Sequence, residues 1–323
     1  MTAPFATGLD ALADAVSVII PTHRRPEYVR AAIQSAAQQS LPPFEIIVID
    51  DGATLPADFS AGPIPPGIDL QVRRIPHVGQ CGARRAGFDI SRGGLLLFLD
   101  DDDVLVPDAV ATLRALYHRD PGLVAAAGAA DSVDGDGVPV GRVNRPLHDI
   151  RPDDLWVRNR IANAGCALIS REAYQLVGGW DADTPNAGDY MLWMKLARAG
   201  RIAGTEQIVL HYRSHVGNET TQGNLFANLR AFRATFRRVF PDLARSEIED
   251  SVLASLITPY VHPAIRHWRD LVRRGEWGAV RRRSAGLLDG IIVASSGPRS
   301  RRELAAALAL WRPKWLRLRR SQA

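Results

Sequence analysis

Five apolar residues run directly into four aspartates in the stretch Leu95-Leu-Leu-Phe-Leu-Asp-Asp-Asp-Asp103. The apolar run is typical of a strand that is buried on both faces of a parallel sheet. Four adjacent carboxylates repel one another, and a divalent cation relieves that repulsion most simply. The stretch therefore predicts a strand that ends at bound Mg²⁺ or Mn²⁺, with phosphate oxygens and water as further ligands. A solvated acidic turn is the alternative.

Two further apolar runs precede this stretch, Val16-Ser-Val-Ile-Ile20 and Glu45-Ile-Ile-Val-Ile49. Between them, residues 26–39 begin with a proline and carry apolar positions at helical spacing, which predicts a helix. A third strand around residues 70–75 and a loop running into a helix over residues 79–91 continue the pattern. Apolar runs that alternate with helices indicate βαβ units and a parallel α/β sheet.

Polar residues follow three of these strands where each one ends. Pro21-Thr-His23 follows the first strand, Asp50-Asp51 the second and Asp100-Asp-Asp-Asp103 the fourth. Ligands of a parallel sheet bind beyond the carboxyl ends of its strands. The three groups are therefore expected to converge on one crevice.

The pattern is less regular further along the chain. Gly135-Asp-Gly137 resembles a hairpin turn, and residues 163–170 read as a strand. A short helix is expected over 171–177, an amphipathic helix over 189–199 and a strand over 208–213.

The charge of the chain is unevenly distributed. Residues 225–323 hold 20 Lys or Arg against 8 Asp or Glu, whereas residues 1–224 hold 20 against 27. The basic part is helical in pattern and mixes Arg with Trp and Leu, which suits helices lying on an anionic membrane. An ordinary helical appendage with a solvated arginine face is the alternative. No nucleic-acid motif accompanies the charge, so no nucleic acid is expected.

The two cysteines, Cys81 and Cys166, form no metal-binding spacing and no disulfide framework. The sequence shows neither a secretory signal pattern nor an apolar run of about 20 residues. We therefore expect a cytoplasmic protein, held peripherally at the inner face of the membrane if its basic helices bind there.

Four segments together resemble a known family: Ser17-Val-Ile-Ile-Pro-Thr22, Ile46-Ile-Val-Ile-Asp-Asp-Gly52, Ala83-Arg-Arg-Ala-Gly87 and Phe98-Leu-Asp-Asp-Asp-Asp103. Their order and spacing are similar to those of the family-two glycosyltransferases of the GT-A fold, over roughly residues 15–215. The resemblance implies a Rossmann-like, mostly parallel sheet flanked by helices, with a C-terminal helical extension.

The resemblance also implies a division of the chain into two regions. Residues 1–224 would form the glycosyltransferase domain. Its nucleotide-sugar half would cover about 15–105 and its acceptor half about 106–224. Residues 225–323 would form the basic helical region.

On the donor side, the resemblance places Pro21 and Thr22 at the border of a nucleoside pocket. It assigns Asp50 to the base or ribose, Asp51 to the turn of the loop and Arg84 to the donor nucleotide.

Asp100, Asp101 and Asp102 match the D-x-D motif of the family. The resemblance implies a ribose contact for Asp101 and direct metal ligation for Asp102, while turn formation is the alternative. Arg85 stands where the family has an asparagine.

On the acceptor side, Val177-Gly-Gly-Trp-Asp181 and Gly188-Asp-Tyr-Met-Leu-Trp193 resemble the segment that carries the general base of the family. The base is then Asp189, which the helix dipole would keep ionised, and a simple helix cap is the alternative. Gly188 stands where the family usually has Glu. Trp193 is expected in the core, and Trp180 is either core or sugar-stacking. His215, in Tyr212-Arg-Ser-His215, is expected to contact the metal or the diphosphate, unless its role is structural.

The expected function is that of an inverting glycosyltransferase. It would move a sugar from a nucleotide-diphosphate donor, UDP before dTDP or GDP, to a glycan or lipid-linked hydroxyl in cell-envelope polysaccharide or glycolipid synthesis. A metal-dependent nucleotidyltransferase is an alternative, although Pro21-Thr-His-Arg-Arg25 stands where its Gly-rich loop would be. Gly79-Gln-Cys-Gly82 does not complete a dinucleotide fingerprint. A non-catalytic scaffold bound through the basic region is the remaining alternative.

Overall fold

The computed structural model describes residues 12–57, 59–134, 137–144, 146–157, 159–181, 188–213, 234, 236–242 and 274–275. The chain forms two compact units, the first made of Met1–Leu155 and Asn159–Thr221, the second of Trp156–Arg158 and Gln222–Ala323. Nearly all of the second unit lies outside the described residues. The division at residue 224 and the helical character of 225–323 therefore stay predictions.

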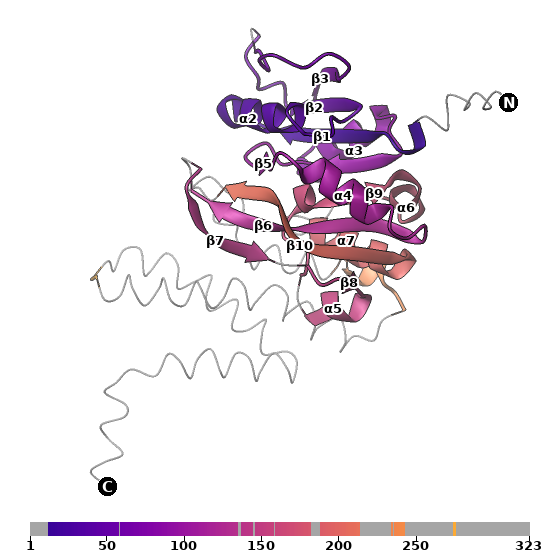
Figure 1. The fold of residues 1–323 in the computed structure, drawn as a ribbon. Helices are drawn as coiled ribbons and strands as arrows, with labels where there is room; N and C mark the ends of the chain where they lie inside the picture. Colours follow the sequence, from indigo (N-terminus) through magenta and orange to yellow (C-terminus); the bar gives the residue numbers. More distant parts are fainter. Residues whose placement is uncertain are drawn as a thin grey trace, which may run out of the picture. The chain divides into compact units, whose positions relative to one another are not determined.

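The described helices and strands alternate through the first 117 residues and become less regular beyond them (Figure 1). In chain order they are β1 (Val16–Thr22), α2 (Pro26–Ala37), β2 (Glu45–Asp51), β3 (Asp69–Ile75), α3 (Gln80–Ile90), β4 (Leu95–Phe98), β5 (Val104–Leu105), α4 (Ala109–Tyr117), β6 (Leu123–Val133), β7 (Pro139–Asn144), β8 (Asp149–Ile150), α5 (Pro152–Val157), the 3₁₀ turn η1 (Ala164–Cys166), β9 (Ala167–Ser170), α6 (Arg171–Leu176), α7 (Gly188–Ala199) and β10 (Arg201–Arg213).

One ten-stranded sheet joins all the strands of this list, in the order β3-β2-β1-β4-β9-β6-β10-β5. β7 pairs with β6 and β8 with β10 off this path. The strands β3, β2, β1 and β4 run parallel to one another, as do β6 and β10. β9 lies between β4 and β6 and is antiparallel to both. The predicted α/β class is thus confirmed, and its parallel part holds the strands that the sequence analysis identified.

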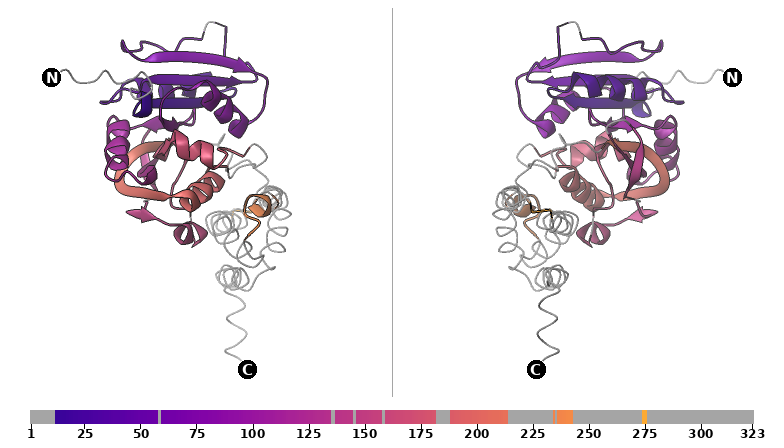
Figure 2. Two further views of the ribbon diagram at one scale, coloured as in Figure 1. Left: turned by 90° about the vertical axis from the view of Figure 1, so that its right-hand side faces the viewer. Right: turned by 90° about the vertical axis from the view of Figure 1, so that its left-hand side faces the viewer.

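The central strands form because their residues are apolar on both faces. Every residue of β1, β2 and β4 is buried, whereas most of β3, at the edge of the sheet, is not. α2 and α3 pack against β1, and α4 and α7 pack against β6 and β10. Figure 2 shows these helices flanking the sheet. α3 approaches closely because Gly87 has no side chain: a Cβ there would lie 2.4 Å from Ile19 Cγ2.

Several elements of the acceptor half differ from the sequence expectation, and β10 begins at Arg201 although a strand was expected only over 208–213. The strand expected over 163–170 is shorter, because Asn163 accepts a 2.6 Å hydrogen bond from the N–H of Gly165 and caps the turn η1. β9 begins only after this turn. β6 was not predicted, since its residues are largely Ala and Gly, which have low strand propensity. The expected hairpin is confirmed by the antiparallel pairing of β6 with β7.

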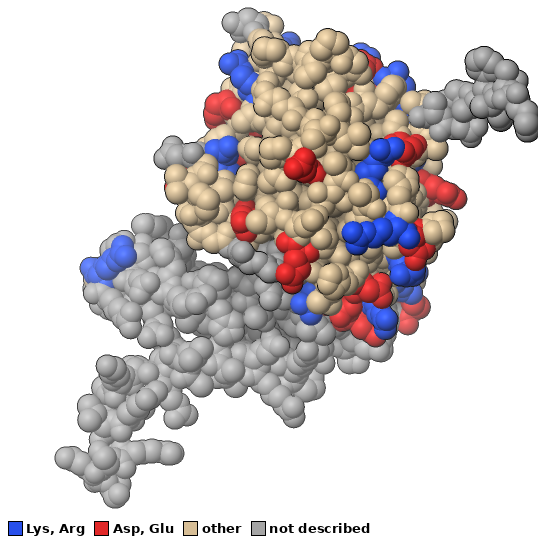
Figure 3. Space-filling model, in the orientation of Figure 1, with Lys and Arg blue, Asp and Glu red and all other residues tan. Residues whose placement is uncertain are grey.

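The surface of the described part carries charges of both signs. On the face seen in Figure 3, acidic and basic side chains are interspersed rather than gathered by sign. Exposed ion pairs of the described part include Arg201 with Asp120 and Arg151 with Asp149. None of the helices in the described ranges combines the length and apolar character that crossing a bilayer requires.

Candidate active site

The carboxyl ends of β1 and β4 lie side by side, because the two strands are parallel neighbours. β4 runs parallel to β1 and ends at Phe98, two residues before the aspartate run. Thr22, the last residue of β1, donates a 2.7 Å hydrogen bond from Oγ1 to Asp101 Oδ2. Pro21 precedes Thr22 and is also buried. The residues that follow the parallel strands therefore converge, as the sheet geometry requires.

Asp101 and Asp102 face the guanidinium of Arg25, which lies three residues after Thr22. Arg25 Nη1 is 3.2 Å from Asp101 Oδ1 and 2.5 Å from Asp102 Oδ2. Burial, and then repulsion by Asp102, raises the pKa of Asp101 to about 7, although the hydrogen bond from Thr22 and the charge of Arg25 oppose the shift. The guanidinium thus offsets only part of the negative charge at this position.

Asp100 and Asp103, at the ends of the aspartate run, are bound by groups from other elements. Asn163 Nδ2 donates to Asp100 Oδ2 at 3.1 Å and to Asp103 Oδ2 at 2.5 Å. The main-chain N–H of Arg213, at the end of β10, donates to Asp103 Oδ1 at 2.9 Å. Burial, and then repulsion by Asp102, raises the pKa of Asp103 well above its usual range. These two carboxylates fix the loop, and Asp101 and Asp102 lie between them.

The two aspartates that end β2 contact different loops. Asp50 is fully buried, and its Oδ1 accepts a 2.7 Å hydrogen bond from the N–H of Thr54. Asp51 accepts hydrogen bonds from the N–H groups of Val78 at 2.6 Å and Gly79 at 2.9 Å. The loop after β2 is therefore turned by Asp50 and not by Asp51, because successive strand residues point to opposite faces. A contact of Asp50 with a base or ribose stays a prediction.

Arg84, in α3, is buried between an acid and an aromatic ring. It forms an ion pair with Asp100, and its guanidinium carbon lies 4.3 Å from the centre of the Trp180 ring. Its Nε is buried without a hydrogen-bond partner among the described residues. The neighbouring Arg85 donates to the main-chain oxygen of Trp180 at 3.2 Å. Trp180 and Trp193 are both fully buried, which confirms the core position of Trp193 and makes Trp180 a core residue too.

Asp189, the second residue of α7, belongs to the same charged neighbourhood. Burial raises its pKa to about 6, while the 2.7 Å hydrogen bond from the N–H of Tyr190 and the charge of Arg84 act in the opposite direction. The negative charge of Asp100 also contributes to this rise in pKa. The N-terminal end of a helix favours the ionised form of a carboxylate and would not raise its pKa. Burial has the larger effect on Asp189. At pH 7 the group is still largely ionised, and it can accept a proton at little cost.

Gly188 packs against Cys81 of α3, which leaves no room for a side chain at position 188. A Cβ on Gly188 would lie 2.4 Å from Cys81 Sγ, closer than real contacts allow. Cys81 is buried, and that burial is the main cause that raises the pKa of its thiol. The thiol therefore occupies the space that a longer side chain at position 188 would need.

Two site residues were missed by the sequence analysis. Arg25 could have been noticed, because it follows β1 in the same loop as Thr22. Asn163 gave no signal, since the strand expected there hid its capping role. His215 lies outside the described residues, so its contact with a metal or diphosphate stays a prediction.

The sequence model of glycosyl transferase family 2 matches residues 17–178, about half of the chain. The chain therefore belongs to this family, as the order of its motifs predicted. An uncharacterized glycosyltransferase of Rickettsia bellii is 26% identical over 215 residues, which cover 62% of this chain and 30% of that protein. The chondroitin synthase of Pasteurella multocida is 26% identical over 219 residues, which cover 65% of this chain and 22% of the synthase.

The chain thus spans less than half the length of these two relatives. Among solved structures, S. aureus TarS 1-349 in complex with UDP-GlcNAc superposes with a TM-score of 0.59 at 17% identity. The match covers 74% of this chain and 70% of that one. At this identity the likeness shows a shared fold, in agreement with the expected GT-A architecture.

Proposed function

We propose that this family member transfers a sugar, with inversion, from a UDP-sugar to an acceptor hydroxyl, and that Asp189 is its general base. The observation that carries the proposal is the electrostatic link between Asp189, Arg84 and Asp100. A carboxylate whose pKa is raised to about 6 by burial lies within the influence of a buried guanidinium and the first aspartate of the D-x-D motif. The proposal therefore places the base and the donor residues at one site, where they act on one substrate pair.

On the donor side, the proposal gives Arg84 the diphosphate or nucleotide as its partner. A buried donor without a partner costs free energy, and an anionic ligand beside Nε would relieve that cost. Thr22, Asp50 and Asp51 are proposed to line the nucleoside side. UDP is preferred to dTDP or GDP because the TarS structure of the same fold contains UDP-GlcNAc.

The aspartate run fits a hard divalent cation such as Mg²⁺ or Mn²⁺. Burial raises the pKa of Asp101 to about 7, and repulsion by Asp102 adds to the shift, so the carboxylates of the run lie close enough to repel one another. Asp102 is the proposed ligand, with His215 as a second candidate. Such a cation, when bound, neutralises charge on the departing diphosphate.

The chain's own residues supply alignment and proton transfer. Asp189 removes the proton from the acceptor hydroxyl as the acceptor oxygen bonds to the anomeric carbon. The bond between that carbon and the diphosphate oxygen breaks at the same time, and nucleoside diphosphate leaves with the bonding electrons. Arg84 stabilises the anion, and Asp100 holds Arg84 in place.

The acceptor and the cellular setting are proposed from the relatives and from the charge of the chain. Both a glycan and a lipid-linked hydroxyl fit a family that includes polysaccharide synthases, which supports a role in cell-envelope synthesis. A peripheral contact between residues 225–323 and the inner face of the membrane remains part of this proposal.

The test is calorimetric titration of the full chain with UDP, dTDP and GDP, in Mn²⁺ and in chelator. Metal-dependent binding of UDP that is lost in Asp102→Asn is expected. Asp108→Asn is the matched control, because Asp108 is exposed and lies outside the aspartate run. No binding of any nucleotide to folded wild type would refute the proposal and favour the scaffold alternative.

The base is tested separately with Asp189→Asn. This variant should lose transfer to the acceptor while it keeps its affinity for UDP. Asp89→Asn, an exposed position in α3, is the control that should keep both. Loss of UDP binding in Asp189→Asn would contradict the assignment of the base.

A further inference from the structure

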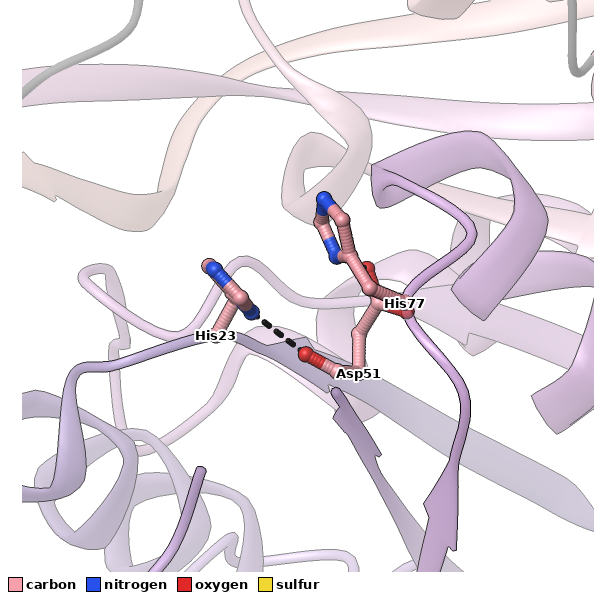
Figure 4. Close-up of side chains that lie close together, drawn as sticks. All are labelled: His23, Asp51 and His77. Carbon is pink, nitrogen blue, oxygen red and sulfur yellow. Dashed lines mark hydrogen bonds and ion pairs between the residues drawn. The ribbon is translucent and has the colours of Figure 1, made fainter. Parts of the chain in front are cut away.

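Three metal-ligating side chains gather at the ends of β1, β2 and β3, and none belongs to the aspartate run (Figure 4). His77 Nδ1 lies 2.8 Å from Asp51 Oδ2, and His23 Nδ1 contacts the main-chain oxygen of Asp51. One ligand atom from each side chain lies within 4.8 Å of the other two. Both imidazoles direct a nitrogen toward the same residue, and their rings stack with centroids 4.4 Å apart.

The backbone of adjacent strands brings these groups together. His23 follows β1, Asp51 ends β2 and His77 lies two residues after β3, and the three strands are parallel neighbours. Gly52 turns the chain after β2 with φ of +97°. A Cβ at Gly52 would lie 3.3 Å from His23 Cε1 and 3.4 Å from His77 Cβ. The glycine therefore leaves room for both rings.

Asp51 is held in a fixed orientation, while the two histidines can adjust. The N–H groups of Val78 and Gly79 bind the Asp51 carboxylate at 2.6 and 2.9 Å. Hydrogen bonds of this kind orient a ligating carboxylate from its outer side. The His77 side chain is 59% exposed, and His23 is partly exposed. Ions from solvent can therefore reach the group, and small rotations can draw both nitrogens onto one ion.

We infer that His23, Asp51 and His77 form a site for Zn²⁺ or a similar transition-metal ion. Two imidazole nitrogens and one carboxylate oxygen, completed by water, are a donor set that Zn²⁺ binds tetrahedrally. Mg²⁺ takes oxygen ligands, so this set selects against it. Nδ1 of each ring faces an oxygen of Asp51 and therefore carries the ring proton in the metal-free protein, so the lone pair of the neutral imidazole lies on Nε2. An ion binds each ring through Nε2, or through Nδ1 once the proton has moved to Nε2. The aspartate run offers oxygen ligands, so the two sites differ in the ions they prefer.

The metal site stands independently of the proposed function, but its effect on the donor rests on that proposal. Asp51 ends the strand that is proposed to line the nucleoside pocket. An ion bound to Asp51 would occupy or reshape that pocket. Bound Zn²⁺ is therefore expected to weaken UDP binding.

The experiment is titration of the metal-stripped full chain with Zn²⁺ alone, followed by calorimetry, with the visible spectrum of bound Co²⁺ as a report on nitrogen ligation. We expect one Zn²⁺ per chain at this site. His77→Ala should lower the affinity for Zn²⁺ by a factor of about 10 to 100 or more. Loss of a group that only hydrogen-bonds to a metal ligand already has an effect of about 10- to 100-fold. Because His77 is exposed, circular dichroism should show that this variant is folded.

Two control variants locate the ion. His118→Ala removes another exposed histidine that contacts an aspartate, Asp14, but has no second imidazole beside it in the described part of the chain, and Zn²⁺ affinity should be unchanged. Asp102→Asn should also keep its affinity for Zn²⁺. Equal affinity of the wild type and His77→Ala, or no Zn²⁺ binding to the wild type, overturns the inference. Neither result touches the test with UDP and Mn²⁺, so the two proposals can fail separately.

Discussion

Arg25 Nη1 lies 2.5 Å from Asp102 Oδ2, so the carboxylate proposed as the metal ligand already has a cationic partner. A divalent ion that binds Asp102 competes with this guanidinium for the negative charge of the carboxylate. The free energy of the ion pair is therefore subtracted from the affinity for the ion. Donor binding can supply a new anionic partner for Arg25, which links the metal and the nucleotide.

Arg25→Ala should therefore bind Mn²⁺ in the absence of nucleotide about fivefold more tightly than the wild type, since a partly exposed ion pair is worth on the order of 1 kcal/mol. Calorimetric titration with Mn²⁺ measures the change. Arg30→Ala removes an exposed arginine of α2 and should leave the affinity unchanged. Unchanged or weaker binding in Arg25→Ala would count against competition between the two cations.

Transfer should fall about tenfold for each pH unit below about 6 when both substrates are saturating. Burial raises the pKa of Asp189 to about 6, and the base must be ionised to accept the acceptor proton. Turnover at saturating donor isolates this titration from that of Asp101, which acts on donor binding. A decline in turnover that begins only near pH 4 would contradict the role of Asp189.

Asp189→Asn should be more stable than the wild type at pH 8. The pKa of Asp189 rises on folding from 3.8 to about 6, so its contribution to stability is present at low pH and lost as pH rises through 6. Because the residue is partly exposed, the expected gain is on the order of 1 kcal/mol, or about 2–4 °C in Tm. Thermal unfolding at pH 8 and pH 5 should show the gain shrinking at the lower pH. An equal gain at both values would point to a different cause.

Gly188→Ala should destabilise the protein, although alanine normally stabilises a helix by up to about 1 kcal/mol relative to glycine. The new Cβ meets Cys81 Sγ, and overpacking of this kind costs about 1–3 kcal/mol. Urea unfolding should show that Cys81→Ala, combined with Gly188→Ala, recovers most of the loss. If the double variant is as unstable as the sum of the single variants, Cys81 is not the obstacle.

The parallel half of the sheet could be predicted because burial on both faces leaves uninterrupted apolar runs such as Ile46–Ile49. β6 could not be predicted, because its small residues have low strand propensity and form a strand here only through close packing against β10. A Cβ on Gly128, within β6, would lie 2.5 Å from Val209 Cγ1 of β10. Tertiary packing therefore decides this strand, and its own propensity does not.

The site was predictable where a motif follows directly on a strand, as Thr22 and Asp101 do. It was not predictable where a contact depends on how a loop folds. The reach of Arg25 across to Asp102 is one example. The contact of the loop after β2 with Asp50, where Asp51 was expected, is another, because it depends on which face each side chain takes at the end of β2.

The end of β10 is tied to the aspartate run through a single residue. Arg213 holds Asp103 through its N–H, and its Nε donates to the main-chain oxygen of Asp102 at 3.0 Å. The loop that is proposed to hold the ion is thereby anchored to a strand that lies far along the sequence. The spacing of its carboxylates thus depends on the position of β10 as well as on the loop itself.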